Sequence, residues 1–286
     1  MHAALLLLAD SRLPAGGHGH SGGTEEAIRT GAVHDLSSLA SFLRGRLATA
    51  GLVAAGLAAA ACELGASGRV VGDHPANGDH LPGRRVVGDD PANGDHLPGR
   101  PGHRLAGEVP GTGSAADATD PSAGRAGREA PAGRTGPWAR LDAEADARTA
   151  SPAQREAGRT QGRLLLRTAR RIWPSPVLDD LAGAVPQGAH HPIALGAAAA
   201  AAGCAPGEAA LAAAYTAVTG PATAAVRLLG LDPVPVHRLL ADLAPQLERI
   251  AASVPARWEA LPAHAAPALD LLAEGHARAE SRLFVS

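Results

Sequence analysis

The stretch SPAQREAGRTQGRLLLRTARRIWP, residues 151–174, carries the clearest local signal of the chain. Ser151 and Gln154 have the S-x-x-Q spacing of a capping box, in which the serine hydroxyl accepts a hydrogen bond from an amide of the first helical turn. Pro152 stands at the first helical position, where its missing N–H group has no helical partner to lose. We therefore predict a helix that begins after Ser151 and runs to Trp173, because Pro174 stops it.

Helical signals continue on both sides of this segment. Asp35 is placed to cap an upstream helix whose leucines recur at spacings of three and four, which puts them on one face: Leu36, Leu39, Leu43 and Leu47. The other predicted helices are Leu52–Leu64, Pro192–Ala202, Pro206–Leu229 with a break at Gly220 and Pro221, Val234–Val254, and a last helix from Pro267.

The helix predicted at Val234–Val254 has an apolar stripe with the same 3/4 spacing: Val236, Leu240, Leu243, Leu247, Ile250 and Val254. No segment of the chain shows sustained apolar and polar alternation with β-branched residues, so no sheet is predicted. Aromatic residues make up only 2% of the chain, which leaves leucine, valine and alanine to build the core. The predicted fold class is all-α, with one helical-bundle domain.

Residues 67–137 differ in composition from the rest of the chain, since they are rich in Gly, Pro, Asp, Arg and Ala and contain no Ile, Met, Phe, Tyr or Trp. Such a segment cannot bury enough apolar surface to offset the entropy lost on ordering, so we expect a long disordered insertion. It contains a tandem repeat of 16 residues, RVVGDHPANGDHLPGR at 69–84 and RVVGDDPANGDHLPGR at 85–100. The domain is therefore predicted to comprise an N-terminal part at 1–66 and the remainder at 138–286.

Global composition restricts the function only broadly. The formal net charge of −2 gives no overall attraction to nucleic acid or to an anionic membrane. Cys62 and Cys204 lack the spacing of a redox pair or a zinc site and are expected to be buried thiols. The apolar run Ala3–Ala9 has no basic flank, and no other stretch reaches about 18 uninterrupted apolar residues. We expect a soluble cytoplasmic protein.

The sequence shows no convincing nucleophile beside a base, no paired carboxylates and no complete metal motif, so an enzyme is not predicted. His18 and His20 have the best metal-like spacing but no third ligand nearby, and they stay only as candidate metal ligands. The repeat histidines His74, His80 and His96 are an alternative metal tether in the insertion. GGHGHSGG resembles a phosphate-binding loop but lacks its GK[ST] ending.

Arginines recur at every fourth position of the helix predicted after Ser151: Arg155, Arg159, Arg163, Arg167 and Arg171. Like charges at this spacing repel one another by a few tenths of a kcal/mol each, and Glu156 is the one acid within the run. The row suggests a surface for an acidic partner. A solvated helix face remains the alternative.

Three separated segments resemble the urease accessory protein UreF family, in the order in which that family shows them. They are LLLLADSRLPAGGHGHSGGTEEAI at 5–28, SPAQREAGRTQGRLLL at 151–166 and EGHARAESRLFVS at 274–286. The closing Arg-Leu-Phe followed by a final Ser is the most specific of them. His18 departs from the family, since many members carry an aromatic residue there.

The resemblance implies an all-α protein that dimerises, binds the accessory protein UreD (also called UreH), recruits the GTPase UreG and docks on apo-urease. Nickel would be handled by the assembled complex, with no cofactor bound tightly by this subunit. By the same resemblance the partner-binding residues would be Asp10, Ser11, Pro14, Gly16, His20, Ser21, Glu25, Arg155, Glu156, Gly162, Tyr215, Arg227, His276, Arg282, Leu283 and Phe284.

Structural alternatives exist for several of these residues. Pro14 and Gly16 would only shape a turn, and Arg155 and Glu156 would pair internally. Leu283 and Phe284 would fold back on the body instead of meeting a partner. Tyr215 and Arg227 would pack or line a dimer seam. Two other functions remain open beside the scaffold. One is activation of the UreG GTPase by an arginine, and the other is direct carriage of nickel by histidines.

Overall fold

The computed structural model describes residues 2–10, 13–14, 19–72, 136–255, 260–261 and 263–285. Its helices are α1 (Ala3–Ala9), α2 (Thr24–Arg29), α3 (Leu36–Arg46), the π-helical turn η2 (Leu47–Gly51), α4 (Leu52–Gly72), α5 (Pro137–Ala147), α6 (Pro152–Ile172), α7 (Pro176–Ala184), α8 (His191–Ala201), α9 (Pro206–Leu229), α10 (Pro233–Ser253) and α11 (Pro267–Arg278). No strand occurs in the described part, so the all-α prediction is confirmed.

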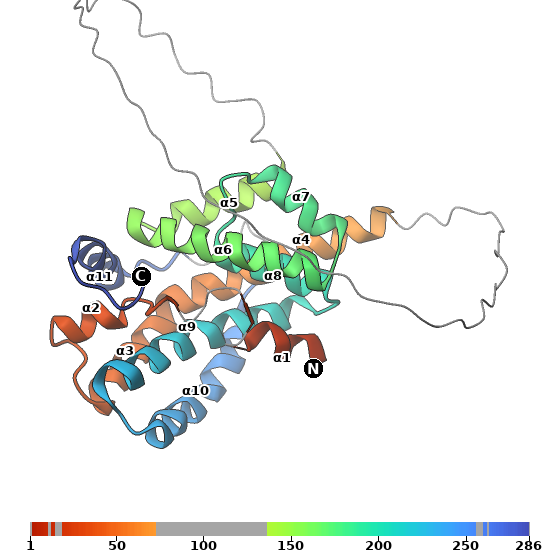
Figure 1. Cartoon of the computed structure of the whole chain (residues 1–286). Coiled ribbons are helices and arrows are strands. Elements are labelled where there is room, and N and C mark those ends of the chain that lie inside the picture. Colours follow the sequence, from red (N-terminus) through yellow and green to blue (C-terminus); the bar gives the residue numbers. More distant parts are fainter. Residues whose placement is uncertain are drawn as a thin grey trace, which may run out of the picture. The chain divides into compact units, whose positions relative to one another are not determined.

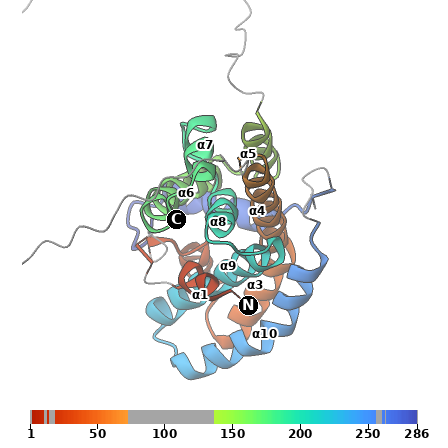
Figure 2. The same ribbon diagram turned by 90° about the vertical axis from the view of Figure 1, so that its right-hand side faces the viewer.

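The described residues belong to one compact unit with two apolar clusters. The first cluster combines side chains of α1, α4, α5, α6, α7, α8 and α9. The second combines side chains of α2, α3, α4, α9 and α10. Helices α4 and α9 contribute to both, and Figures 1 and 2 show them running through the bundle beside α8. The two clusters therefore share α4 and α9 as their common wall.

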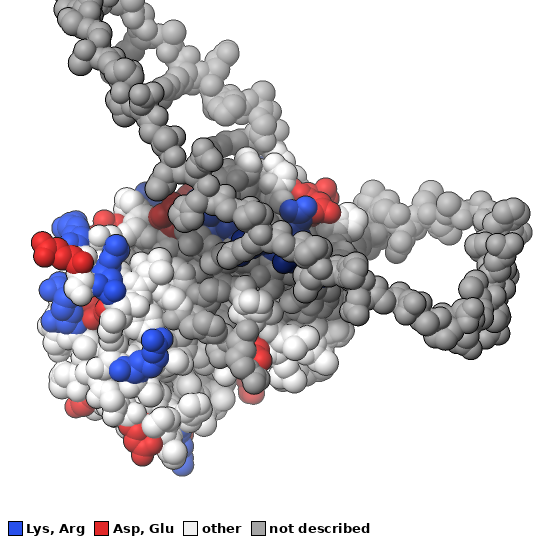
Figure 3. All heavy atoms as spheres, viewed as in Figure 1, with Lys and Arg blue, Asp and Glu red and all other residues white. Residues whose placement is uncertain are grey.

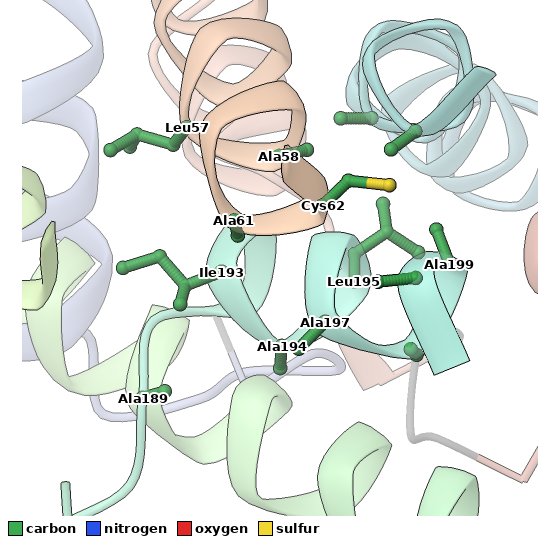
Figure 4. Close-up of a cluster of buried hydrophobic side chains, with 14 of the residues drawn as sticks. Leu57, Ala58, Ala61, Cys62, Ala189, Ile193, Ala194, Leu195, Ala197 and Ala199 are labelled. Carbon is green, nitrogen blue, oxygen red and sulfur yellow. The ribbon is translucent and has the colours of Figure 1, made fainter. Parts of the chain in front are cut away.

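Helix α8 is the most buried element, because every residue from Ile193 to Ala200 is at most 1% exposed or a buried glycine. Its small side chains let its backbone approach α4 closely. A Cβ atom added at Gly196 would lie only 2.2 Å from the carbonyl oxygen of Ala58. Figure 4 shows the contact, with Ala58, Ala61 and Cys62 of α4 facing the α8 residues around Leu195. Both cysteines are buried and form no disulfide, as expected.

The predicted start of α6 is confirmed. The Ser151 hydroxyl accepts a hydrogen bond from the Gln154 amide at 3.1 Å, and the helix ends with Trp173 as its C-cap. Two acids of α11 add to this cap, since Glu274 accepts from the Ala153 amide at 3.0 Å and Asp270 accepts from the Ser151 amide at 3.1 Å. Helix N-termini leave such amides without helical acceptors, so α11 is attached to the start of α6.

Helix α9 corrects one prediction, because it runs from Pro206 to Leu229 without a break at Gly220 and Pro221. A proline inside a helix leaves the carbonyl four residues earlier without its amide donor. Here that carbonyl belongs to Ala217, and the Nε atom of Arg46 donates to it at 2.8 Å. A side chain 171 positions away along the chain thus replaces the missing bond.

The apolar stripe of α10 also differs from the predicted stripe, at the position expected for Leu240. Leu239 is 6% exposed and takes the place that was predicted for Leu240, which is half-buried, and Val254 is the C-cap of the helix. The face is set by contact with α9 and α3, so a residue at either of two adjacent positions satisfies the periodicity.

The boundary of the predicted insertion is shifted at its first end. Helix α4 continues past residue 67 to Gly72, because adding a residue to an existing helix costs far less than starting one. Residues 73–135, with most of the tandem repeat and its histidines, lie outside the described residues. Helices α1, α5 and α7 were not predicted, and all three are short.

Within the residues that the structure describes, two helical stretches are long and apolar enough to cross a membrane by length and composition, Leu36–Gly68 and Pro206–Leu229. Their most apolar windows are 61% and 56% buried inside the fold. Both contribute to the shared wall of the two clusters, which accounts for their apolar character without a membrane.

Candidate functional site

The N-terminal motif is folded by two left-handed glycines. Gly22 and Gly23 have φ angles of 61° and 87°, a conformation that side-chain-bearing residues rarely adopt, and Gly23 is the N-cap of α2. Ser21 is fully buried and its hydroxyl accepts a hydrogen bond from the Glu25 amide at 3.3 Å. The turn therefore sets Glu25 in the first turn of α2.

Glu25 holds the C-terminal tail by its backbone. Its two carboxylate oxygens accept hydrogen bonds from the amides of Leu283 at 2.7 Å and of Phe284 at 3.0 Å. His276 of α11 lies against the same carboxylate, with 3.7 Å between Nδ1 and Oε2, and its Nε2 atom is 3.2 Å from the Phe284 carbonyl oxygen. The tail is thus bound by an acid–histidine pair, in which His276 is buried and Glu25 is partly buried.

Two further contacts complete this arrangement. The Val285 amide donates to the Gly19 carbonyl oxygen at 2.6 Å, and the Arg227 guanidinium of α9 lies 5.0 Å from the centre of the Phe284 ring. A cation over an aromatic face is attractive by about 0.5–2 kcal/mol. We call the set of Gly19, Glu25, Arg227, His276 and the tail residues 283–285 the tail clasp.

The tail clasp separates two neighbouring side chains of the closing motif. Phe284 is 6% exposed and packs on the body of the same chain, so for this side chain the fold-back alternative describes the structure. Leu283 and Val285 point outward, at 77% and 61% exposure. Whether this outward pair contacts a partner stays a prediction.

Replacing Glu25 with alanine is expected to release the tail. The change removes the acceptor of two charge-assisted amide bonds, each worth about 1.5–3 kcal/mol, so hydrogen exchange at the Leu283 and Phe284 amides should accelerate by at least about tenfold. Glu280→Ala, at an exposed acid of the same tail, is the matched control and should leave both amides unchanged. Equal exchange in wild type and Glu25→Ala would contradict the clasp.

A cavity of about 570 Å³ extends beneath the tail clasp, between helices of the two apolar clusters. Its wall includes Asp10, His20, Arg46, His191 and Arg227. Burial lowers the pKa of His20 to about 4, and burial together with the nearby His20 lowers the pKa of His191 to about 4. Both rings are therefore neutral near pH 7.

The arginine row of α6 does not form one exposed ridge. Arg159 is held inside, with Nη1 2.8 Å from an oxygen of Asp142 and Nη2 2.7 Å from an oxygen of Asp146. His190 joins the same network through a 2.8 Å contact between its Nε2 and Asp146. Although burial acts to raise the pKa of Asp146, the hydrogen bond from His190 and the charge of Arg159 outweigh it and lower that pKa.

The outer members of the row also find partners on this chain. Arg155 donates to the carbonyl oxygens of Thr149 and Ala150, and Glu156 pairs with Arg163 at 3.0 Å, so the proposed pair of Arg155 with Glu156 is not formed. Sequence spacing reveals only those acids that lie on the same helix as the arginines. The compensating acids of Arg159 stand on α5, a helix that was not predicted.

The remaining predicted partner-binding residues do not lie together. Some pack inside the fold and others are exposed. Gly162 packs against the backbone of Ala189, and the Pro14 carbonyl accepts from the Thr168 hydroxyl at 2.8 Å. Tyr215 is 41% exposed on α9, and Arg282 lines the cavity. Ser11, Gly16 and His18 lie outside the described residues.

Charged side chains of both signs gather over α2 and α11 on the face seen in Figure 3, beside the tail clasp. The exposed charged residues of α2, of α11 and of the segment after α11 include Arg29, Arg278, Glu280 and Arg282. Within the described ranges, no three His, Cys, Asp or Glu side chains are placed to hold a metal ion. The site is therefore a polar clasp over a cavity, rimmed by exposed charge and by the two outward apolar side chains.

Sequence reasoning missed two parts of this site. Arg46 and Glu26 carry no motif, and they matter only through distant neighbours. Glu26 is 3% exposed, and its carboxylate fills the space where Gly275 of α11 would carry a side chain, with 2.5 Å between Oε1 and the Cβ position. The one sequence signal for Arg46 was Pro221, because a proline inside a helix leaves the carbonyl group four residues earlier without its amide donor.

A family model and individual known proteins point to the same family. The UreF family model matches residues 114–244. The urease accessory protein UreF of Mycolicibacterium vanbaalenii is 39% identical over 284 residues, which covers 99% of this chain and 98% of that protein. The proteins of the same name from Mycobacterium sp. (strain JLS) and Mycobacterium tuberculosis (strain H37Rv) are 38% and 36% identical, each over 99% of this chain.

Proposed function

This chain belongs to the UreF family of urease accessory proteins, and from that premise we propose that it is a non-enzymatic scaffold for loading nickel into apo-urease. In this role it bridges UreD (UreH) and the GTPase UreG in the cytoplasm, as a homodimer within the complex. Nickel is the cargo of the assembly and is not held tightly by this subunit.

The observation that carries the proposal is the way in which the tail clasp presents the chain end. The clasp uses the backbone and Phe284 for attachment, which leaves Leu283 and Val285 exposed in a fixed geometry. Large apolar side chains that stay exposed although the backbone around them is bound are typical of a contact surface. Leu271 of α11, the helix before the tail, is also exposed, at 74%.

Burial of these side chains against a partner would contribute to the free energy of binding. Each leucine or valine fully removed from water contributes about 1.5–3 kcal/mol, and the fixed tail loses little further entropy on binding. The surrounding charges of both signs are suited to orienting a partner rather than to holding it.

Co-purification with the host's UreD and UreG tests this function. The full chain is expected to retain both partners, and a chain lacking residues 282–286 is expected to lose UreD. A finer variant, Leu283→Ser with Val285→Ser, keeps the backbone bonds of the clasp and should weaken UreD binding by at least about tenfold. Leu6→Ser with Leu7→Ser, at exposed residues of α1, is the matched control and should bind normally.

Two results would count against the scaffold. One is a folded full-length chain that retains neither partner. The other is equal loss of UreD in the α1 and tail variants, which would indicate general destabilisation instead of a tail contact.

A further inference from the structure

Arg46 is the last residue of α3 and one of the cationic residues on the cavity wall. Its Nε donates to the Ala217 carbonyl oxygen at 2.8 Å, and its Nη1 donates to the Gly22 carbonyl oxygen at 2.7 Å. A guanidinium group has five N–H donors in a rigid plane. These two bonds fix the plane and leave its other donors for the cavity.

No carboxylate in the described part of the chain pairs with Arg46. The acids that line the cavity include Asp10, Glu156 and Asp270, and of these Glu156 pairs with Arg163 while Asp270 accepts from an amide. Burial lowers the pKa of Arg46 to about 10, as expected for a cation that is withdrawn from water without a counter-charge. The side chain nevertheless stays cationic at neutral pH.

Charged side chains of both signs line the described wall. The cationic ones are Arg46, Arg148, Arg227 and Arg282, and the acidic ones are Asp10, Glu156 and Asp270. His20 and His191 are neutral near pH 7, because burial lowers the pKa of each to about 4, and they add no charge. Because the cationic side chains outnumber the acidic ones, the wall favours an anion over a metal cation.

The backbone next to Arg46 is itself unusual. The π-helical turn η2 follows directly at Leu47–Gly51, and its residue Ala50 lines the same cavity. Such single wide turns inside longer helices occur frequently at functional sites, where they change the direction of the neighbouring side chains. The turn is an observation independent of the charge of Arg46.

We propose that this cavity binds a small oxoanion, of the carboxylate or phosphate class, through the guanidinium of Arg46. The volume of about 570 Å³ lies within the range of small-molecule sites, which are mostly apolar with a few placed polar groups. The site lies beneath the tail clasp, yet its occupancy needs no partner protein.

Titration of the purified full chain tests the proposal. Acetate and inorganic phosphate are compared with chloride at constant ionic strength, by calorimetry and by thermal unfolding. We expect saturable binding of acetate, of phosphate or of both, and the arm that saturates identifies the class of the anion. Arg46→Gln should weaken that binding at least tenfold, whereas Arg44→Gln, at an exposed arginine of the same helix, should leave it unchanged.

A second variant covers the case in which Arg46→Gln fails to fold through loss of its bonds to Ala217 and Gly22. Ala50→Leu keeps Arg46 and fills the space beside it, and it should weaken anion binding by the same factor. The proposal is overturned if neither anion binds more tightly than chloride, or if Arg44→Gln weakens binding as much as the cavity variants do. Failure of the anion site would leave the partner-binding results unaffected.

Discussion

Gly162→Ala is expected to prevent stable folding. A Cβ atom at this position of α6 would lie 1.8 Å from the carbonyl oxygen of Ala189 and 3.1 Å from the carbonyl carbon of His190, and both are backbone atoms that have no rotamer to change. Relief requires that α6 and the start of α8 move apart, which opens the first apolar cluster. We expect a loss of more than about 4 kcal/mol in the free energy of unfolding.

The control for this prediction is another helical glycine. Gly45 lies on the exposed side of α3, and nothing lies within 4 Å of its Cβ position. Gly45→Ala should therefore stabilise the chain by about 0.5–1 kcal/mol through the lower entropy of the unfolded state. Urea unfolding followed by circular dichroism measures both variants, and a Gly162→Ala protein within 1 kcal/mol of wild type would contradict the close contact of α6 with α8.

Arg159→Met is expected to have the second largest effect. It leaves the Asp142 carboxylate, 4% exposed, without the cation that compensates it, and it also removes the donor to the Gly188 carbonyl oxygen at 2.7 Å. Breaking one side of a buried ion pair typically costs about 3–5 kcal/mol. Denaturant unfolding of the purified chain should show a loss of this size.

Two comparisons separate the ion pair from general damage to α6. Arg163→Met removes an arginine that is 44% exposed and whose partner Glu156 is 69% exposed, so it should cost less than about 1 kcal/mol. Combining Arg159→Met with Asp142→Asn should restore part of the lost stability, because the uncompensated charge is removed. If the double variant is no more stable than Arg159→Met alone, the ion-pair explanation fails.

The sequence predicted those features of the fold that depend on neighbouring residues. Ser151 and Asp35 both cap helices as their spacing indicated, and the predicted leucines Leu39 and Leu43 of α3 and Leu47 of η2 are fully buried. These features need only a few consecutive residues to be recognised. Helices α5 and α7 were missed because each is short, so its apolar positions repeat over only two or three turns.

The candidate site was predictable in composition but not in arrangement. The resemblance singled out Glu25, Arg227, His276 and Phe284, and the structure brings all four into the tail clasp. Their contacts join residues up to 259 positions apart, and no local pattern encodes such a pairing. Arg46 was missed for the same reason. It donates to the Ala217 carbonyl oxygen, which lacks a helical donor because of Pro221 on another helix.

The alanine-rich contact of α8 with α4 reverses the usual tolerance of a protein core to substitution. In a core of leucines, truncation to alanine opens a cavity and is the damaging change. Here the side chains of Ala194 and Ala197–Ala200 are already as small as an ordinary side chain can be, and each is fully buried. Enlargement is the damaging change at these positions, so the sequences compatible with this fold are limited along α8 by an upper bound on side-chain volume more than by a lower bound on hydrophobicity.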